Sequence, residues 1–242
     1  MEACYHQNMK VIKVAVLEIQ QSAPGKFQAV ISLPSGKKAK PGQYFQAHRL
    51  KDEHAVLPIT LYPGGMTNKS GSEIFTTAPP IPPTWQPGDE LLLRGPLGKG
   101  FQLPHQTSRL ALAALDAGCA HLLPLASQVL ENGGEVALFT DHSTPHLPTQ
   151  VEISPLASLG NALLWANFLA VSGTPNQVTN LKTKLNPRQE LPCPAQALIL
   201  IPMPCGGLGS CGVCALPGNK GKALLACEDG PVFDWQQLPF QV

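Results

Sequence analysis

The stretch PCGGLGSCGVC, residues 204–214, places three cysteines within a short glycine-rich segment, and a fourth cysteine follows at position 227. The spacing is C-x5-C-x2-C-x12-C, and four of the seven residues between the first three cysteines are glycine. Four of the chain's seven cysteines therefore gather near its C-terminal end. In a chain without an expected secretion signal, such a group favours metal or iron–sulfur ligation over disulfide bonds.

A [2Fe–2S] cluster needs four thiolates that converge on a small volume, with backbone N–H groups directed at the sulfurs. Glycines let the backbone approach closely. Plant-type sites have a C-x4-C-x2-C loop and a distant fourth cysteine, and the present loop has one residue more in its first interval. A structural zinc site is the alternative, but such sites usually have two CxxC pairs and this segment has one. We predict a [2Fe–2S] cluster with the metal ligands Cys205, Cys211, Cys214 and Cys227.

The composition excludes several classes of protein. The 242 residues include 17 basic and 16 acidic side chains, so the net charge of +1 offers little attraction for a nucleic acid. Hydrophobic residues make up 43% of the chain, which is enough for a sizeable core, and no run of 18 apolar residues predicts a membrane span. The first residues lack a basic region followed by an apolar stretch, so we expect no signal peptide and a cytoplasmic location.

Residues 1–103 are predicted to form an antiparallel β-barrel. Short stretches rich in β-branched and apolar residues alternate with Pro-Gly turns, which is typical of a small barrel or sandwich. The predicted strands are residues 11–17, 27–33, 44–47, 57–61 and 90–94, and the turns are Pro24-Gly25, Pro41-Gly42 and Pro87-Gly88.

From residue 104 to residue 196 the pattern changes and predicts an α/β domain with a parallel sheet, because apolar strands alternate with helical segments. The predicted strands are residues 110–115, 135–140, 168–172 and 198–201, and the predicted helices are residues 120–132 and 175–185. The last of these strands leads directly into the cysteine segment, so residues 197–242 are predicted to form a small cluster-binding domain.

Three motifs resemble one known family. PGQYF occupies residues 41–45, RGPLGKGF occupies residues 94–101, and the cysteine loop is followed by ACEDGPVF at residues 226–233. Together they resemble the electron-transfer subunit of heterodimeric dihydroorotate dehydrogenase, a family of ferredoxin-reductase-like flavoproteins. The resemblance covers most of the chain. It implies an FAD-binding-type barrel, a Rossmann-like nucleotide-binding-type domain and a [2Fe–2S] domain within the boundaries given above. A glycine-rich turn without a ligand is the alternative for residues 94–101.

The resemblance also implies where nucleotide cofactors would bind. FAD would lie against the residues aligned with the family's flavin motif and its GPLG element, namely Pro58, Ile59, Thr60, Gly95, Pro96 and Gly98. The arginine of that motif is replaced by the apolar pair Val56-Leu57, and the later Gly-Thr element by residues 76–80. The glycine-rich turn of the nicotinamide domain retains only Gly118, and Asp116 in the same turn would place a negative charge near a pyrophosphate. FAD is therefore a candidate cofactor, whereas NAD is not expected to bind.

We therefore predict an iron–sulfur electron-transfer subunit without catalytic residues of its own. Its [2Fe–2S] cluster would relay electrons to or from a catalytic oxidoreductase subunit, itself a flavoprotein, in a hetero-oligomer. Two alternatives stay open. One is the FAD- and NAD-binding electron-transfer subunit of dihydroorotate dehydrogenase, and the other is a zinc-stabilised docking module without enzymatic activity.

Overall fold

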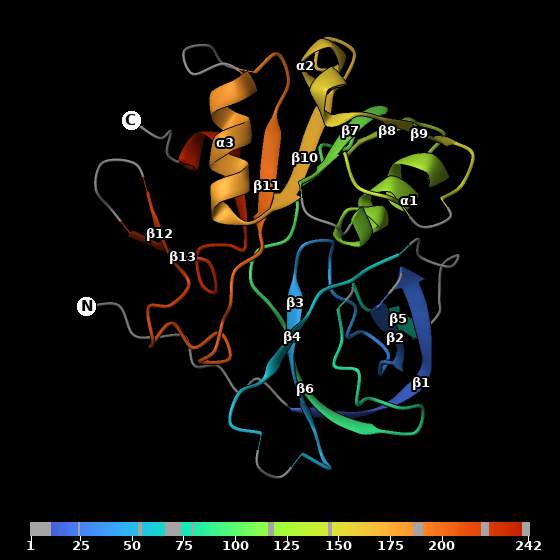
Figure 1. Ribbon diagram of the computed structural model, residues 1–242, viewed down its shortest axis with the longest axis vertical. Coiled ribbons are helices and arrows are strands. Elements are labelled where there is room, and N and C mark those ends of the chain that lie inside the picture. Colours follow the sequence, from blue (N-terminus) through green and yellow to red (C-terminus); the bar gives the residue numbers. More distant parts are fainter. Residues whose placement is uncertain are drawn as a thin grey trace.

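The computed structural model describes residues 11–23, 25–52, 55–65, 74–78, 80–115, 119–144, 147–185, 191–218 and 223–238. Two large sheets dominate the molecule. An antiparallel sheet lies in the lower half of Figure 1 and a mainly parallel sheet with helices lies in the upper half. The C-terminal segment, with a small two-stranded sheet, lies on the left beside both.

The antiparallel sheet has six strands in the order β4-β3-β6-β1-β2-β5. Its strands are β1 (Ile12–Ala23), β2 (Lys26–Ser32), β3 (Tyr44–Arg49), β4 (Ile59–Leu61), β5 (Ile74–Thr76) and β6 (Glu90–Leu97). The two edge strands approach each other after β4, where Pro63 forms an antiparallel bridge with Thr77. The amide of Gly64 also donates to the carbonyl of Thr76 at 2.8 Å. These contacts join the two ends of the sheet and close it into a barrel.

Alternation along the strands separates the two faces of the barrel wall. Phe45, Ala47 and Leu61 belong to the cluster of buried side chains inside the barrel. Tyr44 belongs instead to a second cluster, which includes the parallel sheet. Because successive side chains point to opposite faces of a strand, the even-numbered residues of β3 face outward, toward the rest of the molecule.

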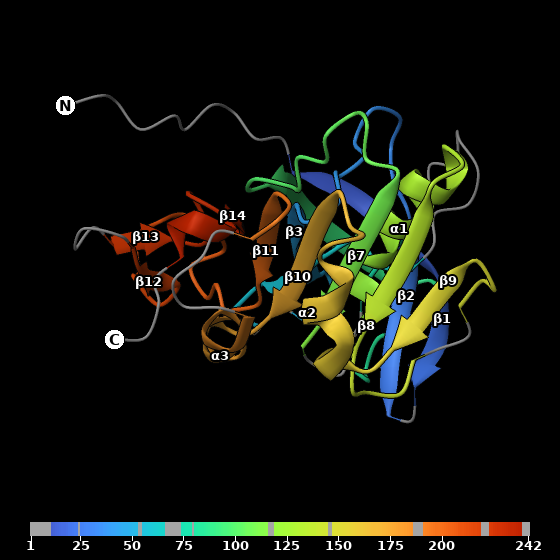
Figure 2. The ribbon, with the colours of Figure 1, turned by 90° about the horizontal axis from the view of Figure 1, so that it is seen from above.

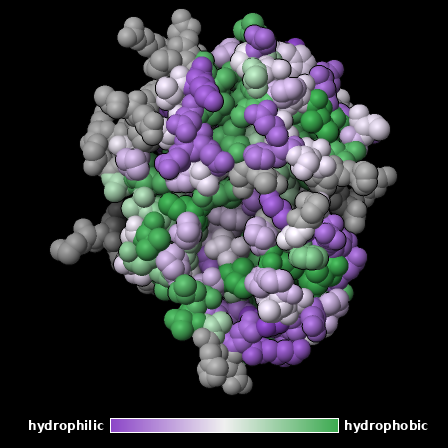
Figure 3. Space-filling view, in the orientation of Figure 1, coloured by the Kyte–Doolittle hydropathy of each residue, from purple (hydrophilic) through white to green (hydrophobic). Residues whose placement is uncertain are grey.

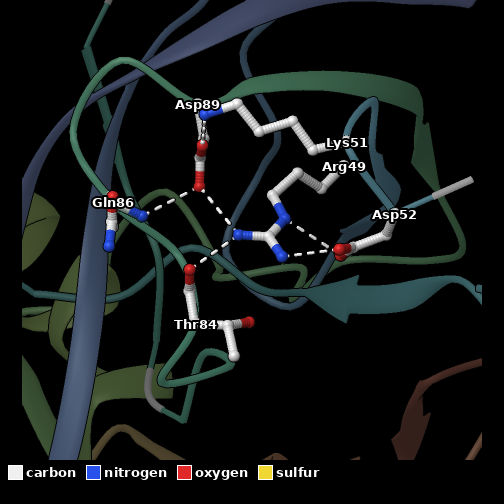
Figure 4. A network of polar contacts seen from close by, with 6 residues as sticks. All are labelled: Arg49, Lys51, Asp52, Thr84, Gln86 and Asp89. Carbon is white, nitrogen blue, oxygen red and sulfur yellow. Dashed lines mark hydrogen bonds and ion pairs between the residues drawn. The ribbon is translucent and has the colours of Figure 1, made fainter.

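A polar network fixes one end of the barrel (Figure 4). The buried carboxylate of Asp89 accepts hydrogen bonds from Arg49, Lys51 and the backbone amide of Gln86. Burial raises the pKa of Asp89, but these hydrogen bonds outweigh the burial and hold the pKa at about 2. Arg49 also donates to the carboxylate of Asp52 and to the carbonyl of Thr84, so its guanidinium joins β3 to the loop before β6.

The second sheet has the order β14-β11-β10-β7-β8-β9. All its neighbouring pairs are parallel except β11 with the edge strand β14. Its strands are β7 (Arg109–Ala114), β8 (Glu135–Phe139), β9 (Val151–Ser154), β10 (Phe168–Gly173), β11 (Ala195–Ile199) and β14 (Val232–Asp234). Helices α2 (Leu159–Ala162) and α3 (Pro175–Leu185) lie on one face, and α1 (Leu123–Glu131) on the other (Figure 2). Such a doubly wound arrangement follows when right-handed crossovers run outward in both directions from the central strands.

Capping residues set the start of α3 and the end of α1. At the start of α3, Thr174 and Gln177 form a reciprocal pair: the Gln177 side chain accepts from the Thr174 amide at 2.9 Å, and the Thr174 hydroxyl accepts from the Gln177 amide at 3.5 Å. This is a capping box, followed by proline at the first helical position. Helix α1 ends at Glu131, with Asn132 as its C-cap, and Gly133 follows with a φ of +75°.

The C-terminal segment packs into the same core as the parallel sheet. Strands β12 (Ala215–Pro217) and β13 (Ala223–Leu225) form a hairpin, and β14 then joins the large sheet. The cluster of buried side chains around the parallel sheet also contains Cys214, Cys227 and Tyr44. The buried ammonium of Lys182 on α3 donates to the carbonyls of Trp235 and Leu238, which follow β14 in the chain. Barrel, α/β layer and cysteine segment are therefore packed against one another.

The predicted fold class is confirmed: an antiparallel barrel is followed by a Rossmann-like domain of the ferredoxin-reductase type and a C-terminal cysteine segment. The predicted helix at residues 175–185 matches α3. The domain boundaries stay predictions, and the one between residues 196 and 197 falls inside β11. The expected glycine-rich turn at residues 116–118 lies outside the described residues. Within the described part of the chain, no helix is both long and apolar enough to cross a membrane.

Candidate metal centre

A hairpin brings two of the four predicted ligands together. Strands β12 and β13 pair so that Ala215 lies opposite Leu225, and the Ala226 amide donates to the Cys214 carbonyl at 3.0 Å. Cys214 and Cys227 thus stand at the open end of the hairpin, with their sulfurs 3.3 Å apart. Both thiols are buried. Burial and the neighbouring Cys214 thiol raise the pKa of Cys227 to about 12.

The glycine-rich loop forms the second pair, Cys205 and Cys211. Burial raises the pKa of the Cys205 thiol, but backbone amides of Leu208, Ser210 and Cys211 and the Cys211 thiol donate to its sulfur and bring the pKa to about 6. The loop can direct several amides at one sulfur because its glycines take left-handed backbone conformations, with φ from +69° to +76° at residues 206, 207 and 209. These hydrogen bonds favour the thiolate form of Cys205.

The four cysteines lie as two neighbouring pairs. Cys205 and Cys211 form one pair, Cys214 and Cys227 form the other, and Cys205 also acts electrostatically on Cys227. No three His, Cys, Asp or Glu side chains among the described residues converge so as to hold one metal ion. Two pairs of thiolates match what a binuclear cluster requires, because each of its two irons takes two protein ligands.

One side of the cysteine loop is open to solvent. Cys211 is exposed, Cys205 is half-buried, and the loop residues Leu208 and Val213 are exposed by 46% and 53%. In Figure 3, hydrophobic side chains gather on the left of the molecule, over the region where Figure 1 shows the C-terminal segment. A redox group held here would be buried on the Cys214 side and accessible on the Cys211 side.

The barrel wall supports the buried side of the loop through Tyr44. Its hydroxyl donates to the carbonyl of Cys227 at 3.3 Å, and the residue is fully buried. A Cβ atom at Gly207 would lie 2.5 Å from this hydroxyl, and one at Gly98 would lie 2.9 Å from the Tyr44 ring. Both glycines are therefore needed for close packing around Tyr44. The amide of Lys99 adds a hydrogen bond to the carbonyl of Gly230, just after the last cysteine.

The predicted flavin residues fall into two groups. Thr60 lies on the outer face of the barrel, where its hydroxyl accepts from the side chain of Gln46 at 3.0 Å. Pro58 also faces the rest of the molecule, because its ring would lie 3.3 Å from a Cβ at Gly206. Ile59, in contrast, packs against the inside of the barrel. The structure thus brings Pro58 and Thr60 to one surface, and turns the side chain of Ile59 away from it.

The GPLG element is explained in part by packing. A Cβ at Gly95 would lie 2.7 Å from the ring of Phe45, and one at Gly98 would lie 2.6 Å from Pro231. Pro96 lies between these two glycines on β6. The element joins the barrel to the C-terminal segment whether or not it also contacts a ligand.

Two buried polar atoms on this outer face have no hydrogen-bond partner among the residues that the structure describes. They are Oε1 of Gln46 and the hydroxyl of Tyr62, and both residues belong to the strands or loop around Thr60. The ring of Tyr62 contacts the rings of Tyr44 and His121, with centroids 5.8 Å and 5.4 Å apart. Buried polar groups without partners are rare and suggest an absent ligand or water. A flavin ring carries both donors and acceptors, so this surface has the chemistry to hold one.

At the carboxyl end of the parallel sheet, where nucleotides bind in doubly wound folds, one backbone carbonyl is bonded by a side chain of the protein itself. The carbonyl of Leu115, just after β7, accepts from the Gln177 side chain at 2.8 Å. The Leu115 side chain also packs against the end of β10, because a Cβ at Gly173 would lie 2.9 Å from it.

Sequence reasoning missed four residues that the structure places around the site: Tyr44, Gln46, Tyr62 and Arg94. Arg94 had a visible signal, because it is the one charged residue in the apolar stretch LLLRG of β6. The other three become neighbours only through barrel closure and domain packing, which local patterns do not report.

Comparison with known proteins finds a sequence family that matches the cysteine segment. Residues 202–239 match the sequence family described as the iron–sulfur cluster binding domain of dihydroorotate dehydrogenase B. A curated relative is the probable dihydroorotate dehydrogenase B (NAD(+)), electron transfer subunit, of Methanopyrus kandleri. It is 27% identical over 175 residues, and the match covers 63% of each chain. The chain thus spans less than two thirds of that relative.

Solved structures share the fold at low sequence identity. One is the NADH-dependent reduced ferredoxin–NADP oxidoreductase studied for flavin-based electron bifurcation, with a TM-score of 0.71, 19% identity, and coverage of 93% of this chain and 89% of that one. Another is phthalate dioxygenase reductase, with a TM-score of 0.59, 10% identity, and coverage of 90% and 94%. The chain therefore has a ferredoxin-reductase-like fold, and it resembles the electron-transfer subunit of dihydroorotate dehydrogenase B.

Proposed function

We propose, from this resemblance and from the paired cysteines, that the chain is an electron-transfer subunit that carries a [2Fe–2S] cluster. The observation that carries the proposal is the arrangement of Cys205 with Cys211 and of Cys214 with Cys227. Each pair would hold one iron, and the cluster would supply one-electron chemistry when bound. The chain itself contributes the amides that donate to Cys205 and the barrel wall that shields Cys214 and Cys227.

The paired geometry supports an iron–sulfur cluster over a zinc site. A structural zinc ion takes four ligands around one centre, whereas these thiols are arranged two by two. The amides directed at Cys205 also favour a cluster, because hydrogen bonds to the sulfurs are one means by which proteins set cluster potentials. The family match over residues 202–239 agrees with this assignment.

FAD is proposed as a second cofactor, held on the outer face of the barrel next to the cysteine loop. The support is the pair of buried atoms without partners, Oε1 of Gln46 and the Tyr62 hydroxyl, beside Thr60. Pro58 and the backbone of Ile59 would adjoin the flavin, and the Gly95–Gly98 element would border it. NAD is not part of the proposal, because the side chain of Gln177 bonds the carbonyl after β7 where the nucleotide would approach.

Electrons would leave or enter through the exposed side of the loop, at Cys211, Leu208 and Val213. The partner in this proposal is a catalytic oxidoreductase subunit that contains a flavin, and the two chains form a hetero-oligomer in the cytoplasm. The curated relative is described as the electron transfer subunit of such an enzyme. Division into a barrel (1–103), an α/β domain (104–196) and a cluster domain (197–242) is part of the same proposal.

The test is anaerobic purification followed by stepwise reduction with dithionite. The proposal predicts visible absorbance that bleaches on reduction, a rhombic electron paramagnetic resonance signal, and about one electron taken up per cluster. Flavin released by acid from the same sample reports on the second cofactor. A colourless protein that contains zinc and takes up no electrons would contradict the relay function. A coloured, reducible protein without flavin would contradict FAD binding alone.

A further inference from the structure

Arg94 lies between the barrel and the cysteine loop. It is the fifth residue of β6, and its guanidinium would lie 3.3 Å from a Cβ at Gly206, the residue that follows Cys205. Pro58 approaches the same Gly206 position at 3.3 Å. Arg94 also acts electrostatically on Tyr44, whose hydroxyl bonds the carbonyl of Cys227. The Arg94 side chain thus lies close to the loop after Cys205 and acts on Tyr44, which bonds Cys227.

The charge of Arg94 is uncompensated in the described part of the chain. There, Arg94 makes no hydrogen bond and no ion pair, in contrast to Arg49 at the other end of the barrel, which bonds two carboxylates. Arg94 is half-buried. Removing a cation from water without a partner is costly, so a partly buried arginine is expected to lie near a compensating anion.

The side chains that lie beside Arg94 on strands β3 and β4 are not carboxylates. Gln46 on β3 lies directly opposite Arg94, and Thr60 on β4 lies directly opposite Gln46, so the three side chains share the outer face of the barrel. Both neighbours are uncharged. Across from Arg94 lies Gly206, next to the predicted ligand Cys205, whose sulfur would carry negative charge in a bound cluster.

We propose that Arg94 is a positioning residue that compensates the charge of the cluster and raises its reduction potential. This inference rests on the proposed function. Two irons, two sulfides and four thiolates carry a net negative charge, which grows by one when the cluster takes up an electron. A fixed cation nearby stabilises the reduced form more than the oxidised form, so its removal makes reduction less favourable. In this chain the cation is provided by the barrel, not by the cluster segment.

The experiment compares cluster potentials in anaerobic titrations monitored through the signal of the reduced cluster. Arg94→Gln and Arg94→Met both remove the charge. If one of the two variants fails to take up iron, the cluster potential is measured in the other. Arg94→Lys retains the charge. Arg109→Gln is the matched control, because Arg109 is an exposed cation at the first residue of β7. It lies at the amino-terminal end of that strand, whereas the carboxyl ends of the parallel strands face the barrel (Figure 1).

We expect the neutral variants to disfavour reduction at least tenfold, which corresponds to a fall of about 59 mV for a one-electron couple. Arg94→Lys should show less than half of that fall, and Arg109→Gln none. Equal potentials in the Arg94→Gln, Arg109→Gln and unchanged proteins would overturn the inference. So would a full fall in Arg94→Lys, since charge would then not be the cause. Loss of flavin at unchanged cluster potential would also overturn it, because Arg94 would then serve the flavin.

Iron content separates failure of this inference from failure of the proposed function. If the unchanged protein takes up no iron or sulfide, the relay function itself is contradicted before any variant is compared. If it holds a reducible cluster whose potential does not depend on Arg94, only the inference about Arg94 falls.

Discussion

Replacing Gly207 by alanine should destabilise the cluster loop, and replacing Tyr44 by phenylalanine should partly rescue it. Two costs add at Gly207. A left-handed backbone conformation, here at a φ of +76°, costs alanine about 1 kcal/mol. The new methyl group would also lie 2.5 Å from the Tyr44 hydroxyl, and such overpacking costs about 2 kcal/mol.

Tyr44→Phe alone should cost about 1 kcal/mol, because it removes the hydrogen bond to the Cys227 carbonyl. In the double variant the hydroxyl that causes the clash is gone. The nearest atoms to the methyl group are then the ring carbon at 3.4 Å and Leu97 at 3.5 Å, which are ordinary contacts. The double variant should therefore be more stable than the sum of the single effects predicts, by about 2 kcal/mol.

The assay is anaerobic guanidinium unfolding of the iron-loaded proteins, followed by visible absorbance and tryptophan fluorescence. Gly212→Ala is the control for backbone strain, because Gly212 has a φ of +69° and, among the described residues, no atom lies within 4 Å of the added Cβ. It should cost about 1 kcal/mol whether it is made in the unchanged protein or in the Tyr44→Phe variant. Equal costs of Gly207→Ala in these two backgrounds would refute the contact between the loop and Tyr44.

Three further changes test other parts of the account. Asp89→Asn should lower the free energy of unfolding by about 2 kcal/mol through its charged hydrogen bonds. The pKa of Asp89 is lowered to about 2 in the folded state, against about 4 in the unfolded chain. Its contribution to the free energy of unfolding is therefore complete above about pH 4 and is lost as the pH falls toward 2. Urea unfolding should accordingly give the unchanged protein and the variant the same stability near pH 2. Thr174→Ala should cost about 1 kcal/mol by removing the cap of α3, measured by thermal unfolding, and Thr174→Ser should restore most of it. Tyr62→Phe removes a buried hydroxyl without a partner, so it should leave the flavin-free protein at least as stable while weakening flavin retention in gel filtration; unchanged retention would argue against Tyr62 as a flavin contact.

Local sequence signals predicted the elements that depend on local chemistry. Helix α3 was predicted with its observed bounds because proline follows the capping threonine and the helix pattern continues to Leu185. Strand β9 of the parallel sheet was not predicted, because it has only four residues and two of them are exposed. The strand predicted at residues 198–201 is β11, which ends at Ile199 before the proline at position 202.

The sequence singled out the cysteines of the candidate site, but neither their arrangement nor the barrel residues around them. The spacing of the cysteines identified all four sulfurs that the structure gathers. Their division into two pairs depends on the short β12–β13 hairpin, whose strands have three residues each and carry no clear periodicity. The roles of Gln46 and Arg94 depend on neighbours 48 positions apart in the chain, which only the barrel register brings together.

The metal content of the anaerobically purified protein tests the central claim most directly. If two pairs of thiolates hold one binuclear cluster, the unchanged chain should contain about two irons and two acid-labile sulfides. Replacing any one of Cys205, Cys211, Cys214 and Cys227 by serine should remove most of both. Full iron content in all four serine variants, or one zinc ion per chain in place of iron and sulfide, would contradict the account.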